Sequence, residues 1–529
     1  MLRIERRAWG LVIVSAVLQV LIFPLPNLYV LSWIAVAPLL IALLQARQPE
    51  TLQLQGPARL KPASPWQGFL LGYTCGILFY GGNCYWVYNT MKQYGGISPA
   101  GAAGLLILFC LYLGLYHGAF GLIICVLGKK SLRTALVLAP LVWVAVELAR
   151  TRISGFPWDL LGVTQVDNIP LAGIARFTGV YGISFEIMIV NTAFAATLLV
   201  DRKRQWSLWI ATVAAAFVLQ IARWMPFPTI PGDRFAVLVQ ENVPILDNSD
   251  WTRQYYEATF SDLTNLSLAP PGAQGHADLI VWPESPAPFY SSDPGFRSGL
   301  ARIATTAQSW VAAGSIGTER SGGNQEVFNS AVLVNPSGEL VARYDKVHLV
   351  PFGEYLPFPS LFSFAGGLTK EVGTFTPGES RTALKAGPEK LGIFICYESI
   401  FPDEVRRFAN SGAQVFVNIS NDGWYGDSGA YAQHLKQARM RAIENNRWLL
   451  RATNTGVTAA IDPYGRVAQQ APRKVRTALV ASYSLIDSTT FYTRHGDWLA
   501  YSCAIISAGA ILFSLGGISP NPVQGRRIA

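Results

Sequence analysis

Three apolar stretches of this chain each run into a polar side chain that could take part in catalysis: Glu284, Lys346 and Cys396. A cysteine attacks a substrate as the thiolate and therefore needs a base, and a carboxylate whose pKa is raised by burial can be that base. Acyl transfer also needs hydrogen-bond donors that face the developing oxyanion. The residue types therefore predict Cys396 as nucleophile and Glu284 as base, with Lys346 and the backbone N–H of Tyr397 as oxyanion donors.

Each of these side chains also has a structural interpretation. A single glutamate or lysine at the end of a strand is usually a solvated surface residue, and a single cysteine after a strand is more often part of the core. A second candidate base for Cys396 is His348, which follows Lys346 by two residues. The two side chains share a face of the chain only if the backbone there is extended.

The other cysteines do not indicate a second site. All of them lie in strongly hydrophobic stretches, where cysteine most often acts as a small apolar side chain: Cys75, Cys84, Cys110, Cys125 and Cys503. Cys396 therefore has no disulfide partner in its own domain. No Cys-x-x-Cys pair or histidine-rich cluster indicates a metal site, and we expect neither a metal nor a cofactor.

The segments around the candidate residues alternate between strand and helix patterns. Short apolar runs typical of buried strands occupy 235–240, 279–282, 310–314, 391–395 and 415–419. Turn sequences predict hairpins that join 331–334 to 340–344 and 458–461 to 466–468. Helical patterns cover 251–267, 296–308, 403–410 and 431–446. We therefore predict an α/β domain with a mixed sheet and helices outside it.

The rest of the chain is far more hydrophobic. The whole sequence is 51% hydrophobic and 14% charged, whereas soluble proteins carry about 25% charged residues. Apolar runs near the ~20 residues that span a bilayer predict transmembrane helices at 8–24, 27–46, 67–89, 100–128, 134–150, 181–200, 206–223 and 497–517. The predicted domains are a membrane domain at 1–229 with about seven helices, the α/β domain at 230–490, and a last helix with its tail at 491–529.

The net charge of +9 reflects membrane topology better than nucleic-acid binding. If the N-terminus is cytoplasmic, the basic clusters at 3–7, 129–133, 202–204 and 526–527 all lie inside, as the positive-inside rule requires. The first span has no evident cleavage site and is predicted to be a retained anchor. The α/β domain then lies on the outer side. Glu147 and Glu186 lie within or near spans, where we favour a paired structural role over a functional one.

The stretches around the three candidate residues resemble the nitrilase superfamily. The resemblance rests on Trp-Pro-Glu at 282–284, Asp-Lys at 345–346, Pro-Phe-Gly-Glu-Tyr at 351–355 and Ile-Cys-Tyr-Glu at 395–398. Further matching stretches are 418–426 and 433–456, although Gly423 and Tyr425 stand where alanine and phenylalanine are expected. Because membrane spans flank the domain, nearly the whole chain resembles the bacterial apolipoprotein N-acyltransferases, the membrane-embedded branch of that superfamily.

This resemblance implies a layered αββα domain and a role for each site residue. Glu284 would be the base, Lys346 would support the oxyanion, and Cys396 would carry the acyl group. Glu354 would be a second carboxylate beside these three residues. The residues implied to shape the site or line the substrate entrance are Tyr397, Glu398, Trp251 and Trp424.

One apolar, glycine-rich segment at 358–368 has two interpretations. We expect it to be a mobile lid whose Phe362 and Phe364 side chains contact lipid and keep water from the reaction. The alternative is an ordinary packed loop.

The implied reaction moves an acyl chain between two lipid-bearing substrates. The chain leaves the sn-1 position of a phospholipid, typically phosphatidylethanolamine, forms a thioester on Cys396, and passes to the α-amino group of a diacylglyceryl-cysteine at an apolipoprotein N-terminus. The expected enzyme is a monomer in the bacterial inner membrane. Two alternatives remain: a membrane-tethered amidase that uses the same residues but transfers to water, and a transporter with an outer binding domain, which the scarcity of charged residues in the spans disfavours.

Overall fold

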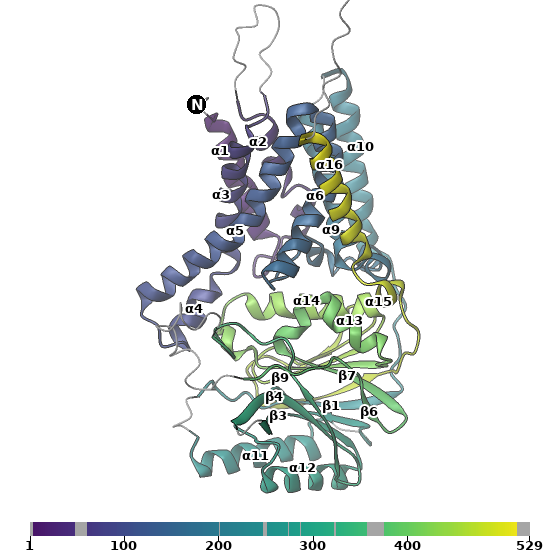
Figure 1. The fold of residues 1–529 in the computed structure, drawn as a ribbon. Coiled ribbons are helices and arrows are strands. Elements are labelled where there is room, and N and C mark those ends of the chain that lie inside the picture. The colour runs from purple at the N-terminus through teal and green to yellow at the C-terminus, as the bar shows by residue number, and fades with distance from the viewer. Residues whose placement is uncertain are drawn as a thin grey trace, which may run out of the picture.

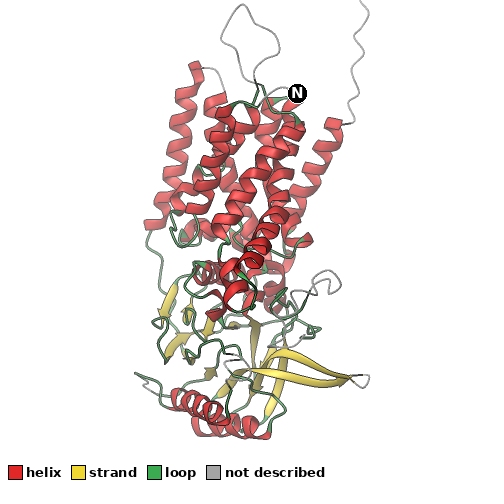
Figure 2. Cartoon of the chain, turned by 90° about the vertical axis from the view of Figure 1, so that its left-hand side faces the viewer, coloured by secondary structure: helices red, strands yellow, loops and turns green. Residues whose placement is uncertain are grey.

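The computed structural model describes residues 4–47, 61–199, 202–246, 251–272, 275–285, 287–321, 324–356 and 375–515. These residues form a bundle of long helices and an α/β domain at one end of the bundle (Figure 1). The described strands belong to the α/β domain, whereas the bundle is helical (Figure 2).

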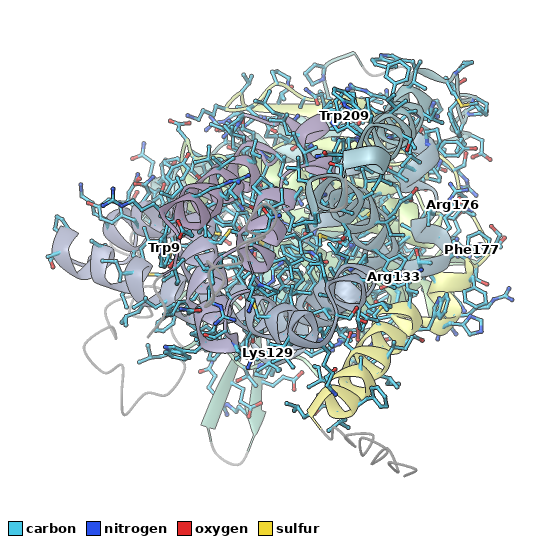
Figure 3. The ribbon with its side chains drawn as sticks, turned by 90° about the horizontal axis from the view of Figure 1, so that it is seen from above. Trp9, Lys129, Arg133, Arg176, Phe177 and Trp209 are labelled. Carbon is cyan, nitrogen blue, oxygen red and sulfur yellow. The ribbon has the colours of Figure 1, made fainter. Side chains whose placement is uncertain are left out.

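The bundle is built from segments on both sides of the α/β domain in the sequence. Its helices are α1 (Arg6–Leu21), η1 (Tyr29–Trp33), α2 (Ala37–Leu44), α3 (Pro65–Asn83), α4 (Trp86–Gln93), α5 (Pro99–Lys130), α6 (Leu132–Ile153), η2 (Leu161–Gln165), α7 (Ile169–Ala172), α8 (Ala175–Thr178), α9 (Val180–Leu199), α10 (Arg202–Ile221), η3 (Ala222–Trp224) and α16 (Trp498–Leu515). Large apolar side chains, among them Trp209 and Phe177, lie toward the outside of the bundle (Figure 3). Such faces suit lipid better than water.

Five described helices are long and apolar enough to cross a membrane: Pro99–Lys130, Leu132–Ile153, Val180–Leu199, Gln205–Trp224 and Trp498–Leu515. The remaining predicted spans correspond to α1, to η1 with α2, and to α3. The prediction of one continuous helix over 27–46 is wrong, because the chain breaks between η1 and α2. Asn191 of α9 stabilises this break by accepting hydrogen bonds from the backbone N–H groups of Val36 and Ala37 at 2.8 and 3.0 Å.

The α/β domain contains two six-stranded sheets that face each other. The first has the order β12-β1-β2-β3-β4-β5 and the second β11-β10-β9-β8-β7-β6. The strands are β1 (Arg234–Gln240), β2 (Leu279–Val281), β3 (Trp310–Ser321), β4 (Asn324–Val334), β5 (Leu340–Asp345), β6 (Leu384–Ala386), β7 (Glu389–Ile395), β8 (Val415–Ser420), β9 (Leu449–Thr453), β10 (Ala459–Ile461), β11 (Val467–Gln470) and β12 (Thr477–Tyr483). The residue patterns predicted a mixed sheet with helices outside it, and the two-sheet layering that the resemblance implies is present.

Helices cover the outer face of each sheet, which gives an αββα sandwich. The first sheet is covered by α11 (Arg253–Leu268) and α12 (Pro294–Ala307), on the side away from the bundle (Figure 1). The second is covered by α13 (Pro402–Asn410) and α14 (Ala430–Asn445), which lie between the sheet and the bundle (Figure 1). The shorter helices are η6 (Cys396–Ile400), η7 (Asp422–Tyr425) and α15 (Phe491–His495).

The bundle and the α/β domain are in direct contact. The Trp158 indole, which follows α6, donates a hydrogen bond to Gln433 Oε1 of α14 at 2.8 Å. The backbone N–H of Val180, at the start of α9, donates to Glu444 Oε1 at 2.9 Å. The layer of α13 and α14 therefore fixes the position of the α/β domain relative to the bundle.

Candidate active site

The ends of β2, β5 and β7 bring three predicted catalytic residues together. Lys346, just after β5, lies with its Nζ 3.3 Å from Glu284 Oε1, just after β2, and 2.9 Å from Glu354 Oε1. The Cys396 thiol follows β7 and interacts electrostatically with Glu284 and Lys346. Glu284, Lys346, Glu354 and Cys396 are all buried. The cluster therefore combines a thiol, an ammonium and two carboxylates in a place largely shielded from water.

Cys396 occupies a strained position between β7 and η6. Its φ of 50° lies in the left-handed region, which non-glycine residues adopt at a cost of about 1–3 kcal/mol and which is enriched at functional sites. Burial raises the pKa of the Cys396 thiol, the nearby Glu284 charge raises it further, and Lys346 opposes both effects. In the resting site the sulfur is therefore a thiol, and it needs a proton acceptor to react.

Lys346 is suited to stabilise negative charge rather than to act as a base. Burial alone would lower the pKa of its ammonium, but the carboxylates of Glu354 and Glu284 outweigh burial and raise the pKa. The side chain is 1% exposed, so its charge acts in a medium of low dielectric constant, where charge–charge interactions are strong.

Asn329 of β4, which no sequence pattern indicated, joins the two carboxylates. Its Nδ2 donates to Glu284 Oε1 at 2.8 Å and to Glu354 Oε1 at 2.6 Å. Its backbone oxygen accepts from the Lys346 N–H at 2.8 Å. The sequence signal that could have identified Asn329 is strand register. Once β4 and β5 are paired across their hairpin, Asn329 lies opposite Lys346.

Glu398 ties the nucleophile to the lysine-bearing segment. Its Oε2 accepts from the backbone N–H of Ile395 at 2.8 Å, while its Oε1 accepts from the N–H of Val347 at 2.8 Å and from the Tyr344 hydroxyl at 2.7 Å. Burial raises the pKa of Glu398, and these donors oppose the rise. One carboxylate thus holds the chain before Cys396 and the chain after Lys346 at a fixed separation.

His348, the alternative base, is engaged elsewhere. Its Nδ1 lies 2.9 Å from Glu404 Oε1, and its ring stacks on Phe401 with centroids 3.7 Å apart. Glu404 also pairs with Arg381 at 2.9 Å. These partners orient the imidazole toward α13, so the structure favours Glu284 over His348 as the base.

A buried polar network supports the backbone at Cys396. His434 Nε2 lies 3.1 Å from the Cys396 carbonyl oxygen, and His434 Nδ1 lies 2.9 Å from Asp422 Oδ1. Arg451 donates to Asp422 at 2.8 Å. Although burial alone would raise it, the charges of Arg451 and His434 hold the pKa of Asp422 well below its usual range. This stretch carries part of the family resemblance, but no sequence pattern indicated a role for His434, Asp422 or Arg451 in supporting Cys396.

The residues predicted to shape the site or to contact the substrate lie in different places. Tyr397 faces the bundle, where its hydroxyl donates to the Gly155 carbonyl oxygen at 3.2 Å. Trp424 of η7 lies against Tyr94 beside α4, with ring centroids 5.4 Å apart. Trp251, which lies just before α11, packs on the core that α11 and α12 share with the first sheet. Phe362, Phe364 and the expected lid lie outside the described residues.

Comparisons with known proteins agree with this architecture. The family model described as "Carbon-nitrogen hydrolase" matches residues 239–490, and the one described as "Apolipoprotein N-acyltransferase N-terminal domain" matches residues 15–193. These matches confirm the predicted fold class. A solved carbon-nitrogen hydrolase from Helicobacter pylori is 19% identical, with a TM-score of 0.35, over 47% of this chain and 88% of that chain.

Two relatives match nearly the whole chain. A protein of Geobacter metallireducens named apolipoprotein N-acyltransferase is 34% identical over 97% of this chain and 96% of its own length. A protein of Methylococcus capsulatus with the same name is 35% identical over 88% of this chain and 91% of its own length. The similarity therefore includes both the helical bundle and the α/β domain.

Proposed function

Because this chain belongs to the apolipoprotein N-acyltransferase family, we propose that it completes lipoprotein maturation through a thioester on Cys396. It transfers an acyl chain from a phospholipid to the α-amino group of the N-terminal diacylglyceryl-cysteine of an apolipoprotein. We further propose phosphatidylethanolamine, through its sn-1 chain, as the donor. The protein is a bacterial membrane protein, and we propose that its catalytic domain lies on the outer side of the inner membrane and that it acts as a monomer.

In the first step, Cys396 takes the acyl group from the phospholipid. Glu284 accepts the thiol proton as sulfur attacks the ester carbonyl carbon. The Lys346 ammonium and the N–H of Tyr397 stabilise the oxyanion of the tetrahedral intermediate. When the carbon–oxygen bond breaks, Glu284 returns the proton to the leaving oxygen. The products are the thioester and a lysophospholipid.

In the second step, the acceptor amine replaces sulfur. The α-amino group first loses a proton to the medium, because only the neutral amine is a nucleophile. It attacks the thioester carbonyl carbon, and the same donors stabilise the oxyanion. Glu284 then takes a proton from the nitrogen and gives it to the departing sulfur. This step forms the amide and restores the Cys396 thiol.

The observation that supports lipid substrates is the contact between the residue that follows the nucleophile and the helical bundle. Tyr397 directly follows Cys396, and its side chain belongs to the apolar core of the bundle rather than to that of the α/β domain. The His434 ring, next to the Cys396 carbonyl, stacks on Trp158 with centroids 5.8 Å apart. A site for small soluble amides has no need of such a position, whereas substrates with acyl chains do.

A labelling experiment tests the proposed reaction. Purified full-length protein is incubated with a phospholipid labelled in its sn-1 chain, and the label is mapped by mass spectrometry. We expect label on Cys396 that moves to the amine of a diacylated lipopeptide, and no transfer by the Cys396→Ala variant. Transfer by Cys396→Ala would disprove the thioester.

The alternative function is a membrane-tethered amidase, which shares the same chemistry up to the acyl-enzyme. In that case water attacks the thioester, and the label appears as free fatty acid even when the lipopeptide is present. The same experiment therefore distinguishes the two functions by the product of the second step.

A further inference from the structure

The peptide unit between Cys396 and Tyr397 carries two polar groups that are fixed relative to each other. One is the Tyr397 N–H, a proposed donor to the oxyanion, and the other is the Cys396 carbonyl. A trans peptide unit is planar, so its C=O and its N–H point in opposite directions. A residue that holds the Cys396 carbonyl therefore also aims the Tyr397 N–H.

His434 of α14 reaches this carbonyl. Its Nε2 lies 3.1 Å from the Cys396 oxygen and 2.8 Å from Ser399 Oγ. The side chain is fully buried. Its ring stacks on Trp158 of the bundle at an interplanar angle of 24° and meets the Tyr425 ring edge-on at 85°. The imidazole is therefore held in one orientation by the bundle on one side and by the α/β domain on the other.

The neighbours of His434 indicate which ring nitrogen carries the proton. Burial and the Arg451 guanidinium lower the pKa of the imidazole, although the Asp422 carboxylate opposes them, so the ring is neutral and has one N–H. Arg451 Nη2, which can only donate, lies 3.1 Å from Nδ1. The Cys396 oxygen, which can only accept, lies near Nε2. A proton on Nε2 suits both neighbours, whereas a proton on Nδ1 suits neither.

Asp422 does not need the proton of His434. Its Oδ1 lies 2.9 Å from Nδ1, but the same oxygen already accepts from Ser420 Oγ at 2.8 Å and from Arg451 at 3.0 Å. We therefore assign the N–H to Nε2, from which it donates to the Cys396 carbonyl.

The layers of the fold give the direction in which the Tyr397 N–H points. His434 belongs to α14, which lies between the second sheet and the bundle (Figure 1). Glu284 and Lys346 follow strands of the first sheet, on the opposite side of the second sheet. Since the Cys396 carbonyl points toward α14, the Tyr397 N–H points toward the side of Lys346, the other proposed oxyanion donor.

We propose that His434 is a positioning residue for acylation: its Nε2–H holds the Cys396 carbonyl and thereby aims the Tyr397 N–H at the oxyanion. The inference rests on the proposed function and adds to it a residue that does not touch the substrate. The strained φ of Cys396 needs such support from its surroundings. Without this hydrogen bond the peptide unit can rotate, and a displacement of about 1 Å can slow a reaction roughly a hundredfold.

The test compares two reactions of the same thiol. Thioester formation passes through an oxyanion and needs the Tyr397 N–H. Alkylation by iodoacetamide does not, because sulfur displaces iodide from a saturated carbon and no charge develops on oxygen. Full-length protein in lipid–detergent micelles receives a phospholipid with a labelled sn-1 chain, and mass spectrometry measures kcat and KM for thioester formation on Cys396. Alkylation of Cys396 is followed in the same way in separate samples.

Three changes at His434 distinguish the hydrogen bond from the ring. His434→Leu has no donor, and the amide of His434→Asn is too short to reach the carbonyl. Both are expected to lower kcat at least about tenfold, with KM and the rate of alkylation within about threefold of the native values. His434→Gln can place an amide N–H near the position of Nε2 and is expected to keep kcat within about threefold. His276→Leu, at an exposed position, is the control and is expected to leave both reactions unchanged.

Equal losses of alkylation and thioester formation would reduce His434 to a structural role and overturn the proposal. Native kcat in His434→Leu and His434→Asn would overturn it as well, and so would a loss in His434→Gln as large as that in His434→Asn. If His434→Leu does not fold, the two amide variants decide. A native chain that forms no thioester would mean that the proposed function itself has failed, which differs from a loss confined to the variants.

Discussion

At the Cys396 thiol, two neighbouring charges act in opposite directions. Burial and the Glu284 carboxylate favour the neutral thiol, whereas the Lys346 ammonium favours the thiolate. The same ammonium is held in place by Glu284 and Glu354. In the proposed reaction, Lys346 therefore has two effects: it stabilises negative charge on the sulfur before attack and on the substrate oxygen after attack.

Replacement of Lys346 by methionine is expected to slow the alkylation of Cys396. A nearby opposite charge typically shifts a pKa by about 1–3 units, so loss of the ammonium raises the thiol pKa and lowers the thiolate fraction at least about tenfold. Iodoacetamide labelling of Cys396, mapped by mass spectrometry between pH 7 and 9, measures this. Lys385→Met, at an exposed position of β6, is the control. Equal or faster labelling of Lys346→Met would contradict the assigned role.

Glu398 offers a second test at the level of one side chain. Glu398→Gln places amide hydrogens among N–H donors that need an acceptor, so we expect a loss of about 2 kcal/mol in stability and at least a tenfold fall in thioester formation. Glu404→Gln is the matched control, because Glu404 bonds to His348 and Arg381 but not to the backbone at Ile395. Thermal unfolding and acylation rates provide the measurement. Equal losses of stability and of acylation rate in the two variants would contradict the role assigned to Glu398.

The residues that sequence could identify are those at strand ends. Glu284, Lys346 and Cys396 each follow an apolar run, so the chain itself marks them. Asn329 lies within a strand, and only the pairing of β4 with β5 places it opposite Lys346. His434 was part of a recognisable stretch, but its contact with the Cys396 carbonyl spans 38 residues. Local patterns identify the three strand-end residues. They cannot identify Asn329 and His434, because the contacts of these two residues depend on long-range strand pairing and packing.

At the scale of elements, the strands of the α/β domain follow from the sequence better than the bundle does. Apolar runs and turn residues correctly predicted β1, β2, β7 and β8 and the β4–β5 hairpin. The break within 27–46 was not predictable, because its cause is distant. Asn191 of α9 accepts from two N–H groups of the break and donates to the Ser32 carbonyl oxygen at 2.7 Å.

The packing of α3 against α5 depends on glycines that let the two backbones touch. A Cβ on Gly121 of α5 would lie 2.2 Å from the Gly68 carbonyl oxygen of α3, and a Cβ on Gly72 would lie 2.2 Å from the His117 oxygen. Small residues at such positions are the usual basis of close helix packing in membranes.

Gly121→Ala is therefore expected to destabilise the protein by about 1–3 kcal/mol, the usual cost of overpacking. Gly104→Ala, in the same helix, adds its Cβ where nothing lies within 4 Å. That change is expected to be neutral or to stabilise by up to about 1 kcal/mol, since alanine is the better helix former. Thermal unfolding in detergent compares the two. Equal melting temperatures of the two variants would show that α3 and α5 can move apart without loss of stability.

At the scale of the whole molecule, ion pairs join the bundle to the α/β domain near α16. Arg152, at the end of α6, lies 2.8 Å from Asp403 of α13 and 2.6 Å from Asp497, just before α16. The Tyr492 hydroxyl donates to Asp497 at 2.9 Å. These contacts connect the end of α6 to α13 and to the segment that leads from α15 into α16. The bundle and the α/β domain therefore form one unit.

The two ends of the bundle differ in charge, and this predicts their sides of the membrane. Trp424 of the α/β domain accepts a hydrogen bond from Thr90 of α4 at 2.9 Å, so the beginning of α5 lies on the catalytic side. With 32 residues, α5 rises about 48 Å along its axis. Lys129, Lys130 and Arg133 therefore lie at the far end, which the positive-inside rule assigns to the cytoplasm.

Single cysteines test this topology. Glu257→Cys places a thiol on α11, where the native side chain is 61% exposed, and Arg133→Cys places one at the exposed start of α6. The native cysteines, Cys396 included, are buried, so the unsubstituted chain gives the background. We expect a membrane-impermeant maleimide to label Glu257→Cys in intact spheroplasts and Arg133→Cys only after lysis. The reverse pattern would put Cys396 on the cytoplasmic side, away from the outer-leaflet substrates that the proposed reaction requires.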